Sequence, residues 1–260
     1  MTIPRLVPCV LVAAILVIPA RSSAFEPDPP GENETIYATV LMRAAPGLLL
    51  ELIDLVEKRA EVLEQAGEQR PLILRHAQGD HWDLMVIQPI GTMEEQYAEP
   101  VMRRRALAGT RLDLTEPLYE QKLRELASWR EETFYTGPSP EEFQAAVAPP
   151  AGYFHVEMFV ALAGKHEELY RQRVMENDYL GRIDRPLNLI FYKTLGGPWD
   201  CFTLGLYRDL QHFAASADVP ADVENEAAIA AGFESSSMIG PYMRSLINWH
   251  QDTIGRIIRQ

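Results

Sequence analysis

Cysteine and basic residues are both scarce in this sequence. The 260 residues include two cysteines, and 24 lysines and arginines stand against 37 aspartates and glutamates, for a formal net charge of −13. A surface with such an excess of acid repels phosphate backbones and anionic lipid, which argues against nucleic acid as a partner. The proportion of hydrophobic residues, 47%, is ordinary and predicts a globular protein with a substantial core.

Several catalytic sequence motifs are also missing. The chain has no glycine-rich phosphate loop, no His-Glu-x-x-His pair, no Gly-x-Ser-x-Gly elbow and no Cys-x-x-Cys pair. Nucleotide-dependent, zincin-type and serine-hydrolase chemistry each lose their main signature. The sequence therefore says more about architecture than about the reaction.

The N-terminus has the composition of a secretory signal. Arg5 precedes an apolar run over residues 6–20, and Ser22-Ser23-Ala24 supplies the small residues of a cleavage site. A membrane anchor is the alternative, but the run is too short to span comfortably and no second apolar stretch of about 18 residues follows. We therefore expect residues 1–24 to be removed and the protein to be exported to the periplasm or the extracellular space, with no stable membrane insertion. Cys201 is then the only cysteine left, so no internal disulfide is expected.

The remainder of the chain reads as two copies of one unit. Arg-Pro-Leu at 70–72 returns at 185–187, Trp-Asp at 82–83 returns at 199–200, and the segment around Trp129 is echoed around Trp249. The landmarks keep their order at a spacing of about 117 residues, which indicates an internal duplication. The predicted organisation is an extended leader, a first unit, a Pro-rich linker and a second unit, at residues 25–35, 36–135, 136–152 and 153–260.

Each copy has the periodicity of a β-α-β-β-α unit. Strands are expected at 36–43, 72–77 and 82–88 in the first copy, and at 153–161, 187–194 and 199–207 in the second. Helices are expected at 48–66, 93–107 and 117–135, and at 165–183, 210–216 and 221–258 with breaks. A sheet with helices on one side gives an α+β layer arrangement.

This order, with its turn positions, resembles the dimeric α+β barrel superfamily, whose units are ferredoxin-like. The resemblance implies that the two antiparallel sheets face each other as a pseudo-dimeric barrel with helices outside. It also implies a ligand between the sheet and the helices of one unit. Known members include cofactor-free monooxygenases, cyclases and isomerases, haem-binding chlorite dismutase-like proteins and pure binding proteins. Members commonly dimerise, but a tandem chain completes its own barrel, so a monomer or a homodimer is expected.

The differences between the copies suggest where a site lies. At positions expected to face the core, the second copy replaces apolar residues with polar or smaller ones: Ala38 by His155, Val40 by Glu157, Val56 by Arg173, Ala60 by Asn177, Ile73 by Asn188, Leu84 by Cys201 and Val86 by Thr203. His250 stands where the first copy has Arg130. Burial alone does not explain these changes. We therefore predict a lined pocket in the second unit and a solid structural core in the first.

The leading hypothesis is an enzyme with acid–base chemistry and no cofactor or metal, of the isomerase, cyclase or lyase type. Histidine titrates near neutrality, so His155 and His250 are the candidate acid–base residues, and Glu157 is placed to tune or orient them. Arg173 would hold an anionic group of a small-molecule ligand. The other predicted substrate-binding residues are Asn177, Asn188 and Tyr192.

Three alternatives remain open from the residues. His155, Glu157 and His250 also make a two-histidine, one-carboxylate metal set, and either histidine could ligate haem iron. A non-enzymatic binding protein would need the same lined cavity. Finally, Glu157 and Arg173 could form a purely structural salt bridge.

Overall fold

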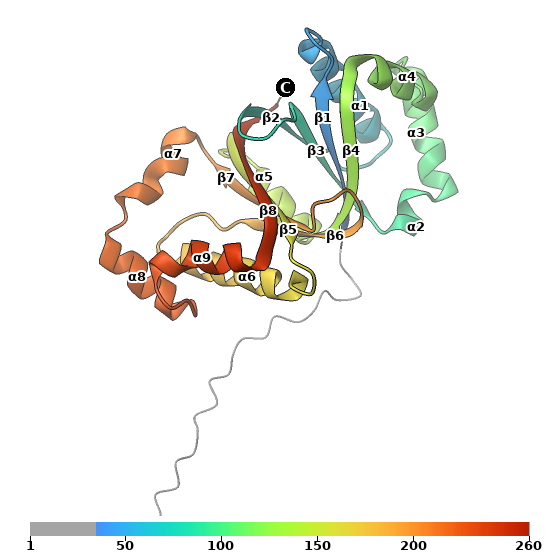
Figure 1. Ribbon diagram of the computed structural model, residues 1–260. Helices are drawn as coiled ribbons and strands as arrows, with labels where there is room; N and C mark the ends of the chain where they lie inside the picture. The colour runs from blue at the N-terminus through green and yellow to red at the C-terminus, as the bar shows by residue number, and fades with distance from the viewer. Residues whose placement is uncertain (1–34, 260) are drawn as a thin grey trace, which may run out of the picture.

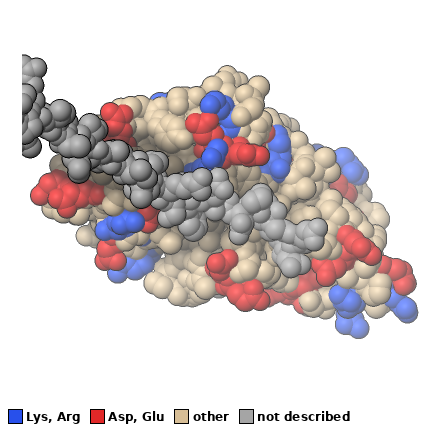
Figure 2. Space-filling model, turned by 90° about the horizontal axis from the view of Figure 1, so that it is seen from below, with Lys and Arg blue, Asp and Glu red and all other residues tan. Residues whose placement is uncertain are grey.

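The computed structural model describes residues 35–259, and Figure 1 shows their arrangement. The predicted signal peptide and nearly all of the predicted leader lie outside these residues. Within residues 35–259, none of the helices is long and apolar enough to cross a membrane. On the face seen in Figure 2, lysine and arginine side chains lie in small groups beside acidic ones.

Eight antiparallel strands in the described part of the chain close into one barrel. They follow the order β1-β3-β2-β8-β5-β7-β6-β4 around it. β4 pairs with β1 of its own unit and with β6 of the other, while β8 pairs with β5 and β2. A single chain thus closes the barrel that the resemblance predicted. The strands are β1 Ile36–Ala44, β2 Leu72–Gln78, β3 Leu84–Gly91, β4 Ala127–Thr136, β5 Tyr153–Ala161, β6 Leu189–Gly196, β7 Cys201–Tyr207 and β8 Ile247–Ile257.

Helices cover the outside of the barrel in two groups, one from each unit (Figure 1). In the first unit α1 packs on α3 and α4, and in the second α6 packs on α8 and α9. The first-unit helices are α1 Leu49–Gln65, α2 Met93–Gln96, α3 Glu99–Arg111 and α4 Glu116–Leu126. The second-unit helices are α6 His166–Arg182, α7 Leu210–Ala214, α8 Ala221–Ala230 and α9 Ile239–Leu246, with short 3₁₀ turns at Ala215–Asp218 and Ser236–Met238.

The last segment of each unit differs from the sequence-based expectation. The helices predicted over 117–135 and 221–258 end at Leu126 and Leu246, and the chain continues directly into β4 and β8. In β4, Thr133 and Tyr135 are buried while their neighbours are more exposed, which is the two-residue period of a strand rather than a helix. Each unit is therefore β-α-β-β-α-β, and its last strand joins it to the other unit.

The segment predicted as a Pro-rich linker, residues 136–152, contains a helix. Residues 140–147 form helix α5, Pro140–Val147, which begins with a capping box between Ser139 and Glu142. Its Phe143 is buried against the rings of Tyr37 and Phe191, at centroid distances of 5.2 and 6.4 Å. The linker thus contributes a side chain to the barrel's own core.

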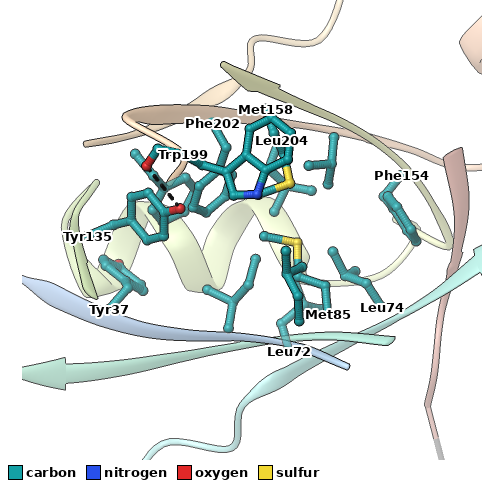
Figure 3. Close-up of a cluster of buried hydrophobic side chains, with 14 of the residues drawn as sticks. Tyr37, Leu72, Leu74, Met85, Tyr135, Phe154, Met158, Trp199, Phe202 and Leu204 are labelled. Carbon is teal, nitrogen blue, oxygen red and sulfur yellow. Dashed lines mark hydrogen bonds between the residues drawn. The ribbon is translucent and has the colours of Figure 1, made fainter. Parts of the chain in front are cut away.

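The barrel interior is filled by side chains from both units (Figure 3). The hydroxyl of Tyr135 donates a hydrogen bond to the backbone oxygen of Trp199 at 3.4 Å, which joins the two halves across this core. A filled interior leaves the outer face of the sheet, beneath the helices, as the place for a site. The labelled interior residues are Tyr37, Leu72, Leu74, Met85, Tyr135, Phe154, Met158, Trp199, Phe202 and Leu204.

Candidate functional sites on the two outer faces

Strand alternation decides which side chains can reach a site. On β1, Tyr37 and Leu41 pack in the barrel interior, so Ala38, Val40 and Met42 face the helices. On β5 the same alternation sends Phe154, Val156 and Met158 inward. His155, Glu157 and Phe159 therefore lie on the helix-facing side, as the sequence predicted.

A cavity of about 500 Å³ lies in the first unit, between the sheet and its helices. Its floor is apolar and comes from both layers: Ala38, Val40, Met42 and Val86 on the strands and Val56, Leu63 and Leu123 on α1 and α4. The same layer also holds a packed hydrophobic core around Leu52, Ala60 and Leu84, so the first unit combines a core with a cavity where a solid core was predicted. Small side chains such as Ala38 and Val40 do not fill the distance to the helix layer, so apolar character at these positions marks a lining.

The mouth of this cavity carries exposed apolar side chains beside polar ones such as Thr110, Thr115 and Glu116. Tyr97, at the end of α2, and Met102, on α3, both line the cavity, yet 57% and 53% of their surfaces are exposed. Exposed apolar side chains around a concave apolar site are typical of ligand-binding clefts. Ala106 lies on α3 in the same lining and is also exposed.

Three arginines line the cavity, and each has a carboxylate partner. Arg59 bonds Glu116 at 2.7 Å, and Arg130 bonds Glu120 at 3.0 Å. The third, Arg105, bonds Glu68 at 2.5 Å, and a further carboxylate in the lining is that of Glu132. Arg59 also lies over the ring of Tyr119, 5.0 Å from its centroid. Burial raises the pKa of Tyr119 to about 12, so its hydroxyl stays protonated at neutral pH. The arrangement offers neutral hydrogen-bonding groups and no spare cation in this rim.

The equivalent space in the second unit is filled by an ionic cluster. Arg173 on α6 is only 3% exposed, and its guanidinium bonds Glu157 at 3.3 Å and Glu176 at 2.5 Å. The same guanidinium lies 4.7 Å from the ring centroid of Phe159. The hydroxyl of Thr203 donates to Glu157 at 3.1 Å. Burial raises the pKa of Glu176, because removal from water disfavours its charged form.

Both predicted histidines converge on one carboxylate, that of Asp252. His155 Nε2 lies 3.8 Å from Asp252 Oδ1, and His250 Nε2 lies 3.5 Å from Oδ2. Asp252 stands directly opposite Glu157 on the paired strands β8 and β5. Burial and the neighbouring Glu157 raise the pKa of Asp252. His155, Glu157, Arg173 and His250 thus lie in one continuous polar cluster.

Asp252 was missed by the sequence analysis for an identifiable reason. Its counterpart in the first unit is Glu132, so a comparison that looks for polar residues replacing apolar ones does not register it. The segment around it was also assigned to a helix. As a strand, the pattern His250-x-Asp252 places both side chains on one face, and that spacing was the available signal.

The remaining predicted site residues have contacts of their own. The Asn177 side chain bonds both backbone groups of Asn188, at 2.8 and 2.9 Å, and so fastens α6 to the start of β6. Tyr192 packs edge-on against Tyr170 at 4.5 Å. Burial raises the pKa of the Tyr192 hydroxyl, which keeps it protonated. These contacts of Asn177, Asn188 and Tyr192 thus belong to the packing of α6 and the sheet, and Tyr192 also packs against the buried cluster that contains Phe159 and Cys201.

Comparison with known proteins places the fold. No known family's sequence profile matches the chain, and no curated protein matches it by sequence. Among solved structures it is similar to an anthrone oxidase-like protein, with a TM-score of 0.54, 11% identity, and coverage of 88% of this chain and 92% of that one. It is also similar to a monooxygenase candidate from Fusobacterium nucleatum, with a TM-score of 0.53, 8% identity, and coverage of 88% and 94%.

A candidate chlorite dismutase aligns less closely, with a TM-score of 0.48, 15% identity, and coverage of 86% and 95%. Identities this low show the fold alone. The chain has the fold of the dimeric α+β barrel superfamily, with both ferredoxin-like units supplied in tandem by one polypeptide.

Proposed function

We propose that this protein binds a small, largely apolar organic molecule in the cavity of the first unit. The cavity itself carries the proposal, because about 500 Å³ of space has an apolar floor, two exposed apolar side chains at its mouth, and arginines that each already have a carboxylate partner. Such a lining favours the binding of a neutral ring system, and the Tyr119 hydroxyl can orient that ligand by a hydrogen bond. An anionic ligand, predicted from Arg173, is not favoured here, since Arg59 and Arg130 already have carboxylate partners.

Two neighbouring residues on α3 provide a matched test. Ala106 and Leu107 are both exposed, but only Ala106 belongs to the lining of the cavity. Ala106→Trp should obstruct the cavity, while Leu107→Trp adds the same ring next to it. The probe is N-phenyl-1-naphthylamine, an uncharged fluorophore whose emission rises in apolar surroundings. We expect saturable binding to the unaltered protein and to L107W, and at least a tenfold weaker affinity in A106W. Absence of saturable binding, or equal affinity in the two variants, would contradict the proposal.

A second candidate function lies in the polar cluster of the second unit, and the convergence of its two histidines favours it. There His155 and His250 are the proposed acid–base residues, with Glu157 and Asp252 orienting them, for isomerisation, cyclisation or elimination on a small molecule. Replacing either histidine with alanine should then abolish turnover and leave the fold intact. Full activity in both variants would contradict this role.

Haem does not fit the second unit. The space beside His155 and His250 is occupied by the buried side chains of Arg173 and Phe159 and by the carboxylates of Glu157 and Glu176. A porphyrin needs flat apolar walls, and this charged, filled layer does not provide them. No step of the proposed chemistry passes through haem.

Export remains part of the proposal on the strength of the N-terminal sequence. Arg5, the apolar run after it and Ser22-Ser23-Ala24 support cleavage before Phe25. N-terminal sequencing of the protein recovered from the periplasm or medium of an exporting host should begin with Phe-Glu-Pro. A chain that keeps Met1 would contradict cleavage.

A further inference from the structure

We propose that His155, Glu157 and Asp252 bind a divalent transition-metal ion on the outer face of strands β5 and β8. Each of these residues offers one ligand atom, and the three atoms lie within 4.8 Å of one another. The inference is independent of the cavity in the first unit, and it assigns His155 to metal ligation in place of the acid–base role that the second candidate function gives it.

The backbone fixes these three side chains on one surface. His155 and Glu157 are two residues apart on β5 and therefore share a face, and Glu157 pairs in register with Asp252 on β8. Central, paired strands hold ligands more rigidly than loops do. β5 is itself hydrogen-bonded on both sides, to β7 and to β8.

The charge balance at this surface favours a cation. Glu157 and Asp252 are carboxylates placed directly opposite each other, and like charges in such a pair repel. Arg173 is shared between Glu157 and Glu176, so a single guanidinium serves two carboxylates. Arg244 also acts on Asp252 through its charge. A divalent ion would offset the remaining negative charge of these carboxylates.

The donor types indicate which ions would bind. One imidazole nitrogen with two carboxylate oxygens suits Zn²⁺, Mn²⁺ or Co²⁺, whereas Mg²⁺ and Ca²⁺ prefer oxygen alone. His250 Nε2, 3.5 Å from the second oxygen of Asp252, is placed as a further donor or as a hydrogen-bond partner of the ligand. The Asp252 side chain is 52% exposed, which leaves an entry path from solvent.

The first unit supplies an internal comparison for this site. At the positions of His155 and Glu157 it has Ala38 and Val40, which carry no donor atoms. Glu132, the counterpart of Asp252, therefore has no histidine or carboxylate beside it at those two positions. Two of the three proposed ligands, His155 and Glu157, are therefore present in the second unit and replaced by apolar residues in the first.

The test uses the full mature chain, freed of metal with a chelator and then dialysed. Co²⁺ is titrated with absorption spectroscopy as the readout, and Zn²⁺ by calorimetry, at neutral pH. We expect one ion per chain and a coordinated-cobalt spectrum for the unaltered protein. His155→Ala and Asp252→Asn should each weaken Zn²⁺ binding at least tenfold. Asp252 is half exposed, so its asparagine variant keeps the fold.

The matched control is His166→Ala, because His166 also faces a carboxylate, that of Asp200, at 3.6 Å, but outside this ligand set. It should bind Zn²⁺ like the unaltered protein. The proposal is overturned if the unaltered protein takes up no stoichiometric ion, or if D252N and H155A bind as tightly as H166A. Binding of the fluorescent probe to the first-unit cavity is measured on the same samples, so failure of one proposal is distinguished from failure of the other.

Discussion

The two units share their strand order and differ in what lies between sheet and helices. In the first unit, Val40 and Val56 leave a cavity with apolar walls, whereas in the second unit their counterparts Glu157 and Arg173 bond each other across the same layer. The same backbone framework thus accommodates either set of side chains between the sheet and the helices. A few side-chain positions decide whether this layer holds an apolar-floored cavity, as in the first unit, or a buried ionic cluster, as in the second.

The largest effect should follow from removing the buried cation. Arg173→Met leaves Glu157 and Glu176 in a buried layer without their shared partner, and breaking such a pair costs about 3–5 kcal/mol. The first-unit counterpart, Val56→Met, adds volume beside a cavity and should cost less than about 1.5 kcal/mol. Free energies of unfolding from urea titrations measure both.

A triple variant separates the charge effect from lost packing. Replacing Glu157, Arg173 and Glu176 together with apolar residues of similar size removes the stranded carboxylates, and should recover most of the stability that R173M loses. If R173M and V56M destabilise equally, the two layers do not differ as described.

Transplanting the second unit's pair into the first should abolish ligand binding there. Val40→Glu combined with Val56→Arg places a charged pair across the cavity floor. We expect the affinity for N-phenyl-1-naphthylamine to fall more than tenfold, because the apolar volume is lost and charge replaces it. A far-ultraviolet circular dichroism spectrum checks that the variant is folded. An unchanged affinity in a folded variant would show that the probe binds elsewhere.

Much of the tandem fold could be predicted from the sequence, but the last strand of each unit could not. The first three strands and the first helix of each unit have clear periodicity, and three landmarks repeat in order, so the tandem barrel could be inferred. The closing strands could not, because α4 passes into β4 between Leu126 and Ala127 with no glycine or proline to mark the change.

Of the two candidate sites, the polar cluster of the second unit could be predicted in part, and the cavity of the first unit could not. That His155 and Glu157 share a face follows from strand alternation, whereas the position of His250 beside them did not follow, because β8 was expected to be a helix. The cavity did not follow, because an apolar residue such as Val40 predicts contact with the helix layer but not whether the opposing side chains fill the distance. Volume between layers depends on helix placement, which local sequence does not encode.

A smaller effect should come from the polar residue that fastens α6 to the sheet. Asn177→Ala removes two hydrogen bonds to the backbone of Asn188 and should cost about 1–2 kcal/mol. The first unit has Ala60 at this position, so the same fastening is absent there. Asp178→Ala, which breaks an exposed ion pair with Arg182 next along the helix, should change stability by less than about 0.5 kcal/mol. Equal effects of N177A and D178A in urea titrations would rule out this role of Asn177.

The smallest effect concerns the exposed end of the ionic cluster and depends on pH. Since burial and Glu157 raise the pKa of Asp252, the folded chain takes up this proton more readily than the unfolded chain. The associated stability is present at low pH and is lost as the pH rises through the raised pKa. In the presence of chelator at neutral pH, Asp252→Asn should therefore stabilise the protein, by about 0.5 kcal/mol for a repelling cross-strand pair. The gain should vanish below the ordinary aspartate pKa of about 4. The same gain at every pH would mean that the folded protein does not disfavour the charged form of Asp252. In that case Asp252 would not differ in this respect from Glu132, its counterpart in the first unit.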